Sequence, residues 1–114
     1  MVNKKIGNFY EEEFKKYMAS KGYWVHLLAN NKYGQPFDVI AVKDNKAWFI
    51  DVKHCASNRF VTSRIEANQQ SAFEFALECG NRNCGFAIYF EVIKEWKFLP
   101  YMKEYKTSYH YSEL

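Results

Sequence analysis

The sequence predicts one α/β (α+β) domain over residues 1–114, in which helices flank a mixed central sheet. The length of 114 residues suits one domain. Hydrophobic residues make up 48% of the chain and charged residues 25%, which is the balance of a globular protein. The spacing of apolar residues changes between the helical and the strand period, in the order αβββαβ with one further short strand.

Two segments have the apolar spacing of amphipathic helices. In residues 6–21, apolar side chains recur three and four positions apart, and Gly22 follows at the place of a C-terminal cap glycine. The second segment opens with a Ser-x-x-Glu capping box at residues 63–66 and continues to about residue 79. Gly80 then closes this predicted helix.

Five segments rich in aromatic and β-branched residues are predicted to be strands. They are residues 23–28, 37–42, 47–53, 85–90 and 96–99. A polar loop at residues 30–35 separates the first two strands, and Asp44-Asn45 is the expected two-residue turn between the second and third. Pro100 limits the last strand to an edge or an end of the sheet.

The central hairpin, residues 37–42 and 47–53, is apolar over most of both faces. With a two-residue turn, one face is formed by Phe37, Val39, Ala41, Trp48, Ile50 and Val52. The other face is apolar near the turn. A hairpin that is apolar on both sides is expected at the covered centre of a sheet.

Charged residues stand at the far end of the second face of this hairpin. The expected register places Asp38 opposite Asp51, with Cβ atoms roughly 4.5–5.5 Å apart, and Lys53 projects from the same face. Two facing carboxylates repel unless a positive charge lies between them. Mg²⁺ or Mn²⁺ suits such oxygen ligands. The alternative is an ordinary ion pair between Asp51 and Lys53, with Asp38 merely ending a strand.

Residues on both predicted helices and on the following loop extend this candidate site. Glu11 and Glu13 border the apolar stripe of the first helix, so either carboxylate could reach the sheet edge or could simply be a solvated glutamate, which the spacing alone slightly favours. Gln69 lies within the apolar stripe of the second helix and must find a partner, either in the backbone or in the site. Arg59 and Arg64 follow the hairpin closely, in a position suited to phosphate contact or simply to a solvated loop.

The composition limits the class of protein. A net charge of +3 and a pI near 8.7 permit nucleic-acid binding without requiring it. No apolar run has the length of a membrane span or a signal peptide, so we expect a cytosolic protein with no membrane partner. Cys55, Cys79 and Cys84 are expected to be reduced thiols; zinc binding by the last two with His54 or His110 is the less favoured alternative.

The predicted order of elements and the charged residues resemble the PD-(D/E)XK nucleases. The matching residues are Pro36-Phe37-Asp38 followed by Asp51-Val52-Lys53. Within that superfamily the sequence is most similar to the Holliday junction resolvases of the archaeal and RecU types. Gly7 and Glu11 match the Gly-x-x-x-Glu pattern of their first helix, and the stretch at 65–69 resembles the start of their second.

The resemblance implies a metal-dependent DNA endonuclease that leaves a 5′-phosphate and a 3′-hydroxyl. The implied metal ligands are Asp38, Asp51, the carbonyl of Val52 and Glu11, the last directly or through water. Lys53 would orient or deprotonate the attacking water, and Gln69 would contact a phosphate or water. The implied cofactor is Mg²⁺, with Mn²⁺ as an alternative.

The resemblance also implies branched DNA as the substrate, in particular a four-way junction, and a homodimer that makes two coordinated cuts. The basic residues expected to contact DNA are Lys4, Lys5, Arg59 and Arg64. Two alternatives remain open at this point. One is a phage or restriction-type nuclease that acts on linear or other branched DNA, and the other is a nucleic-acid-binding module without catalysis.

Overall fold

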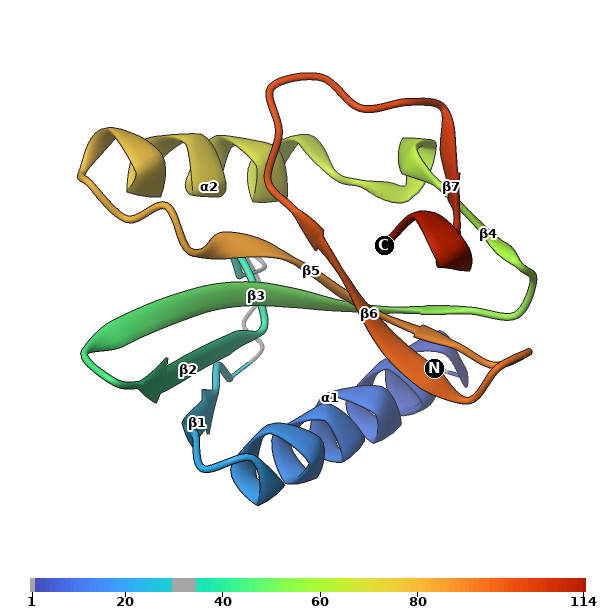
Figure 1. Ribbon diagram of the computed structural model, residues 1–114, viewed down its shortest axis with the longest axis horizontal. Helices are drawn as coiled ribbons and strands as arrows, with labels where there is room; N and C mark the ends of the chain where they lie inside the picture. The colour runs from blue at the N-terminus through green and yellow to red at the C-terminus, as the bar shows by residue number, and fades with distance from the viewer. Residues whose placement is uncertain (1, 30–34) are drawn as a thin grey trace.

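A five-stranded mixed sheet lies between two helices, α1 on one face and α2 on the other (Figure 1). The computed structural model describes residues 2–29 and 35–114, with the side chains described from residue 7 onward. The helices are α1 (Val2–Ser20) and α2 (Ala67–Glu78), with the short 3-10 turns η1 (Thr62–Arg64) and η2 (Tyr111–Glu113). The strands are β1 (Trp24–Leu27), β2 (Val39–Lys43), β3 (Lys46–Cys55), β4 (Arg59–Val61), β5 (Cys84–Phe90), β6 (Glu95–Pro100) and β7 (Ser108–His110).

The main sheet has the strand order β1-β2-β3-β5-β6, and β4 and β7 form a separate two-stranded sheet. Only β3 and β5 run parallel within the described main sheet. Parallel neighbours need a long crossover, and here β4, η1 and α2 provide it. The predicted mixed sheet with flanking helices is therefore confirmed, and β6, which ends at Pro100, lies at its edge as expected.

The turn that sets the register of the central hairpin forms as predicted. Asp44 and Asn45 have φ angles of 53° and 64°, the left-handed conformation that a two-residue hairpin turn requires. The pairing then runs from Lys43 with Lys46 to Val39 with Ile50. The loop predicted at residues 30–35 lies mostly outside the described residues.

One prediction about the faces of this hairpin is wrong. Phe37 was expected on the same face as Val39, and that face packs toward α1 in the structure. The ring of Phe37 instead stacks on Phe49, with centroids 4.8 Å apart, and lies 5.9 Å from that of Phe73 in α2. The strand ladder ends at Val39, and Asp38 donates its backbone N–H to the carbonyl of Ile50 at 3.1 Å. Strict alternation of faces holds only within a regular strand, so it does not reach Phe37.

The start of α2 also differs from the prediction. The capping box was expected to begin at Ser63, but that residue lies in η1 and the helix begins at Ala67. Glu66 is the N-cap and forms a reciprocal capping box with Gln69. The side chain of Glu66 accepts a hydrogen bond from the backbone of Gln69, and the side chain of Gln69 accepts one from the backbone of Glu66. The Ser-x-x-Glu pattern identified the region but not the cap. Glu66-x-x-Gln69 forms an equivalent capping box three residues later, and it satisfies the free N–H groups at the actual start of the helix.

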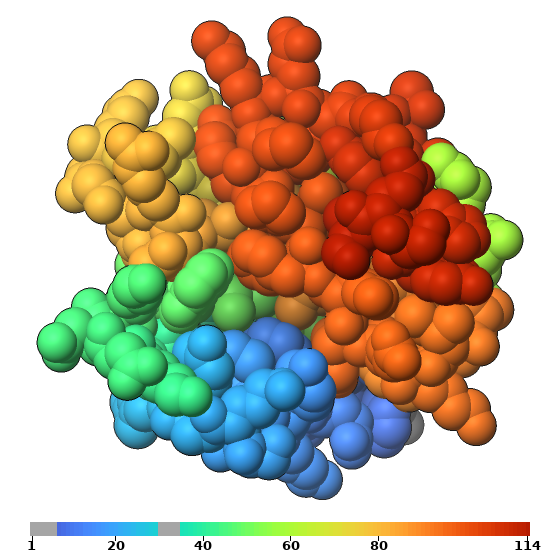
Figure 2. All heavy atoms as spheres, viewed as in Figure 1, coloured from blue at the N-terminus to red at the C-terminus, as the bar shows by residue number. Residues whose placement is uncertain are grey.

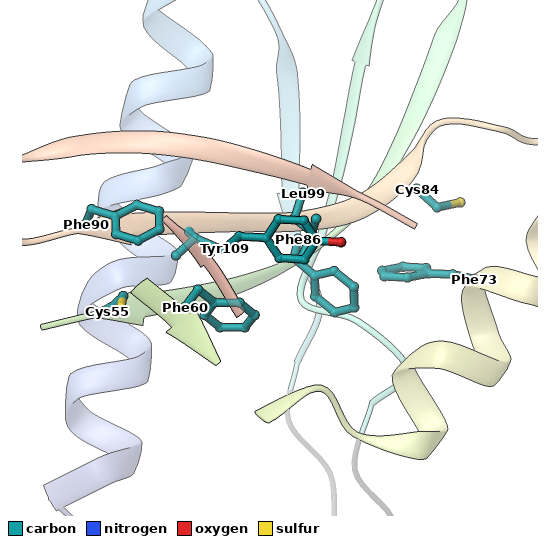
Figure 3. Close-up of a cluster of buried hydrophobic side chains, with 9 residues drawn as sticks. Cys55, Phe60, Phe73, Cys84, Phe86, Phe90, Leu99 and Tyr109 are labelled. Atoms are coloured by element: carbon teal, nitrogen blue, oxygen red, sulfur yellow. The ribbon is translucent and has the colours of Figure 1, made fainter. Parts of the chain in front are cut away.

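The side of the sheet that faces α2 holds the larger buried cluster, which Figure 3 shows in close-up. Phe73 of α2 packs there against Phe86 of β5, with ring centroids 5.3 Å apart. The Tyr-rich C-terminal segment, residues 101–111, contributes Tyr109 to this cluster. β7 also pairs with β4. At least part of the C-terminal segment is therefore core.

An apolar cleft of about 270 Å³ opens between α1 and β6, and Figure 2 shows its mouth between the blue and orange segments. Its walls include Phe14, Trp48 and Phe98, and Lys97 is the one charged residue among the described lining residues. The described lining residues include no carboxylate that could hold the implied metal ion, so the candidate active site is not expected in this cleft. No helix among the described residues is long and apolar enough to cross a membrane.

Candidate active site

A cavity of about 540 Å³ lies where the ends of β2 and β3 meet the first turns of α2 and the side of α1. It brings together the five predicted catalytic residues, which come from four different parts of the chain. The lining residues are Gly7, Glu11, Asp38, Asp51, Val52, Lys53, His54, Arg64, Glu66 and Gln69. His54 and Glu66 line the cavity although neither was predicted to belong to the site.

Asp38 is held to β3 by its side chain. Its Oδ2 accepts a hydrogen bond from the backbone N–H of Val52 at 2.8 Å, and its Oδ1 accepts one from Nε2 of Gln35 at 2.8 Å. A residue in a strand directs its N–H and C=O to the same edge. The carbonyl of Val52 therefore leaves β3 on the side where Asp38 lies, which is the arrangement that the implied ligand set requires.

Asp51 is a nearly buried carboxylate, with 2% of its surface exposed. Nζ of Lys53 lies 3.1 Å from its Oδ2, but within the described part of the chain this oxygen has no hydrogen-bond donor in suitable geometry. Burial, and then the negative charge of Asp38, raise the pKa of Asp51 to about 8, while Lys53 acts in the opposite direction. The single positive charge of Lys53 therefore does not neutralise the negative charges of the carboxylates in the site.

Glu11 of α1 adds a third carboxylate to the cavity. Burial, followed by the charges of Asp38 and Glu12, raises the pKa of Glu11 to about 7. Glu13, the other border residue of this helix, does not line the cavity and lies 3.6 Å from the ammonium group of Lys16. The geometry therefore favours Glu11 over Glu13.

Gln69 connects the second helix to the charged residues of β3. Its Oε1 accepts hydrogen bonds from Nζ of Lys53 at 3.2 Å and from the backbone N–H of Glu66 at 3.1 Å. The sequence left open whether this buried amide finds a backbone partner or faces the site, and it does both. The oxygen that caps α2 also holds the lysine side chain in position.

We expect Gln69→Ala to lower the free energy of unfolding by about 1–2 kcal/mol, because the helix loses a cap and the half-buried Lys53 loses an acceptor. Urea denaturation measures this loss. Ser71→Ala, at an exposed position of the same helix, is the matched control and should stay within about 0.5 kcal/mol of the unchanged protein. Equal stability of the two variants would contradict the role given to Gln69.

The structure separates the basic residues that were predicted to contact DNA. Arg64 lines the cavity, where its guanidinium donates to the carbonyl of His54 at 2.7 Å. Arg59 lies outside the cavity and bonds Ser108 at 2.9 Å and Glu113 at 3.4 Å. The side chains of Lys4 and Lys5 are outside the described residues. DNA contact by any of the four stays a prediction.

The donor set of the cavity suits a hard divalent cation. Across residues 2–29 and 35–114, no three carboxylate, imidazole or thiol groups form a ready-made metal cage. The cavity nevertheless combines Asp38, Asp51 and Glu11, and the buried Oδ2 of Asp51 has no hydrogen-bond donor among the described residues. Oxygen ligands with surplus negative charge are those that Mg²⁺ and Mn²⁺ prefer, and a cation would offset the burial and the mutual repulsion that raise the pKa values of Asp51 and Glu11.

Comparison with solved structures shows that this α+β fold, a mixed sheet with flanking helices, is shared with an archaeal nuclease structure. The solved structure of Hjc, a Holliday junction resolvase from the hyperthermophilic archaeon Archaeoglobus fulgidus, matches this chain with a TM-score of 0.70. The match covers 93% of this chain and 89% of that one at 18% sequence identity. No family model and no curated protein matches the sequence. The fold expected from the resemblance is thus confirmed.

Proposed function

We propose that this protein is a metal-dependent DNA endonuclease, and specifically a structure-specific Holliday junction resolvase. The observation that carries the proposal is the convergence of Glu11, Asp38, Asp51 and Lys53 in one cavity, with a buried and unbalanced carboxylate among them. Carboxylates repel the negatively charged phosphates of DNA, so a module that only binds DNA would gain nothing from three carboxylates in its binding cavity. The likeness in fold to an archaeal resolvase supports the proposal independently of these residues.

The proposed metal ligands are Asp38, Asp51, the carbonyl of Val52 and Glu11, with Glu11 acting directly or through a water molecule. When bound, Mg²⁺ or Mn²⁺ supplies Lewis-acid activation of the phosphate and lowers the pKa of a water molecule. Lys53 orients or deprotonates the attacking water and helps to neutralise charge in the transition state. Gln69 fixes the direction of that lysine through its Oε1, which lies 3.2 Å from Nζ.

The remaining groups of the cavity suit the DNA backbone. Arg64 has nitrogen atoms beyond the one that binds His54, and a guanidinium beside the cut phosphate can hold a neighbouring phosphate. Hydrolysis leaves a 5′-phosphate and a 3′-hydroxyl. A resolvase must cut two strands at symmetric positions, so we also propose a homodimer with one cavity per subunit.

The proposal predicts that the protein cuts a labelled four-way junction and leaves a linear duplex of the same arms uncut. The reactions are run with Mg²⁺, with Mn²⁺ and with a chelator, and the products are resolved on a denaturing gel. Paired symmetric nicks in the junction that disappear with the chelator are the expected result. Equal cutting of both DNAs would overturn junction specificity, and no metal-dependent cutting of either would overturn the nuclease function.

A further inference from the structure

A second cavity, of about 300 Å³, lies beside the proposed active site and is walled mainly by aromatic rings. Its aromatic residues are Phe9 and Tyr10 of α1, Tyr89 of β5 and Trp96 of β6. Phe9 is 56% exposed, so its ring is accessible from solvent at the mouth of this cavity. None of these four rings has a role in the mechanism proposed above.

Most of these rings meet at steep angles, while Tyr10 and Tyr89 are tilted by 36° with centroids 5.4 Å apart, and together the rings form the sides of a box. Tyr10 meets Phe9 edge to face at 85° with centroids 5.1 Å apart, and Tyr89 meets Trp96 at 62° and 5.2 Å. The hydroxyl of Tyr10 donates to Glu91 at 2.8 Å, which fixes the orientation of its ring. The box is therefore a formed feature of the fold.

The aromatic cavity and the active site share a wall. The ring of Tyr10 stacks almost parallel on the ring of His54, with centroids 4.6 Å apart and planes inclined by 10°. His54 lines the active-site cavity, and Tyr10 lines the aromatic one. In sequence these two residues directly adjoin Lys53 and Glu11. A DNA strand with its phosphate at the active site thus has a nucleotide within reach of the second cavity.

We propose that the aromatic cavity binds an unpaired nucleobase adjacent to the phosphate that is cut. This inference rests on the proposed nuclease function and specifies its substrate: DNA with a nucleotide free to leave the base stack, as at a branch point. Every base has a flat π-face, so aromatic rings hold it with little regard to sequence.

The charged residues of the cavity fit this occupant. Glu13 and Glu91 supply carboxylate oxygens, which can accept hydrogen bonds from the exocyclic amino groups of bases. Lys94 is exposed beside them and can face the phosphate of the same nucleotide. A base that remains paired in a duplex presents only its edge, so it cannot enter the aromatic box.

The test uses a set of fluorescein-labelled four-way junctions, each of which lacks the base of one nucleotide near the branch. Binding to the protein is measured by fluorescence anisotropy in the presence of chelator, which prevents cleavage. We expect one abasic position to weaken binding by roughly five- to a hundredfold, the range for one base stacked on aromatic side chains. Phe9→Ala should weaken binding of the intact junction and reduce the effect of that abasic position. Phe75→Ala, at an exposed phenylalanine of α2 that is 66% exposed, is the matched control and should change neither.

The outcomes separate this inference from the function on which it rests. If the protein cuts the junction with Mg²⁺ but binds every abasic junction as tightly as the intact one, the base-binding cavity is overturned and the nuclease stands. An abasic effect of equal size in the unchanged protein and in Phe9→Ala would also overturn it. If the junction is neither bound nor cut, both proposals fail together.

Discussion

Replacing Asp51 with Asn should abolish metal-dependent cleavage of the four-way junction, with a fall in rate of at least about a thousandfold. The substitution keeps the shape of the side chain but removes the charge that would hold the metal ion. Single-turnover cleavage with Mg²⁺ measures the loss. Asp44→Asn is the matched control, because it makes the same chemical change at an exposed turn position whose φ of 53° an asparagine adopts easily.

Stability shows whether this loss comes from chemistry or from misfolding. Asp51 is buried beside Asp38, so an uncharged amide should be tolerated at least as well as a carboxylate in the absence of metal. We expect the thermal midpoint of Asp51→Asn at pH 8 to equal or exceed that of the unchanged protein. Retained cleavage by this variant, or equal loss in Asp44→Asn, would remove Asp51 from the proposed metal site.

Much of the candidate site could be predicted from the sequence because it depends on local rules. The Asp44-Asn45 turn fixes the register of the hairpin, and a strand period of two then places Asp51 and Lys53 on one face. Gln69 stood out because an amide within an apolar stripe needs a partner. These arguments use neighbours in one strand pair or one helix, where geometry follows directly from spacing.

The rest could not be predicted because it depends on contacts between distant segments. The ladder ends at Val39, and the side chain of Asp38 then bonds the backbone of Val52; nothing in the residue types indicates that change. The spacing of the first helix alone left Glu11 and Glu13 open, because the choice depends on how α1 crosses the sheet edge; only the family resemblance favoured Glu11. The aromatic box likewise joins residues of α1 to Tyr89, some eighty positions later in the chain.

Without metal, the stability of the protein should fall as the pH rises. The pKa of Asp51 is raised from 3.8 to about 8 and that of Glu11 from 4.5 to about 7, so between these values the folded state binds more protons than the unfolded state. Stability therefore decreases from about pH 4 to about pH 8 through these two groups, and their contribution is constant outside that window. Thermal unfolding in chelator across this range measures the slope.

Divalent metal should reverse this trend, since it binds the ionised carboxylates and competes with their protons. At a metal concentration about a hundredfold above the dissociation constant, linkage gives about 2.7 kcal/mol, or roughly 10 °C in thermal midpoint for a chain of this size. We expect a gain of this order with Mn²⁺ or Mg²⁺ at pH 8, a much smaller one at pH 5, and none in Asp51→Asn. An equal gain at both pH values, or an undiminished gain in the variant, would mean that the cation binds elsewhere on the surface. A gain that needs high pH and the Asp51 carboxylate would instead place the metal ion between the residues that the nuclease mechanism requires, without relying on any measurement of cleavage.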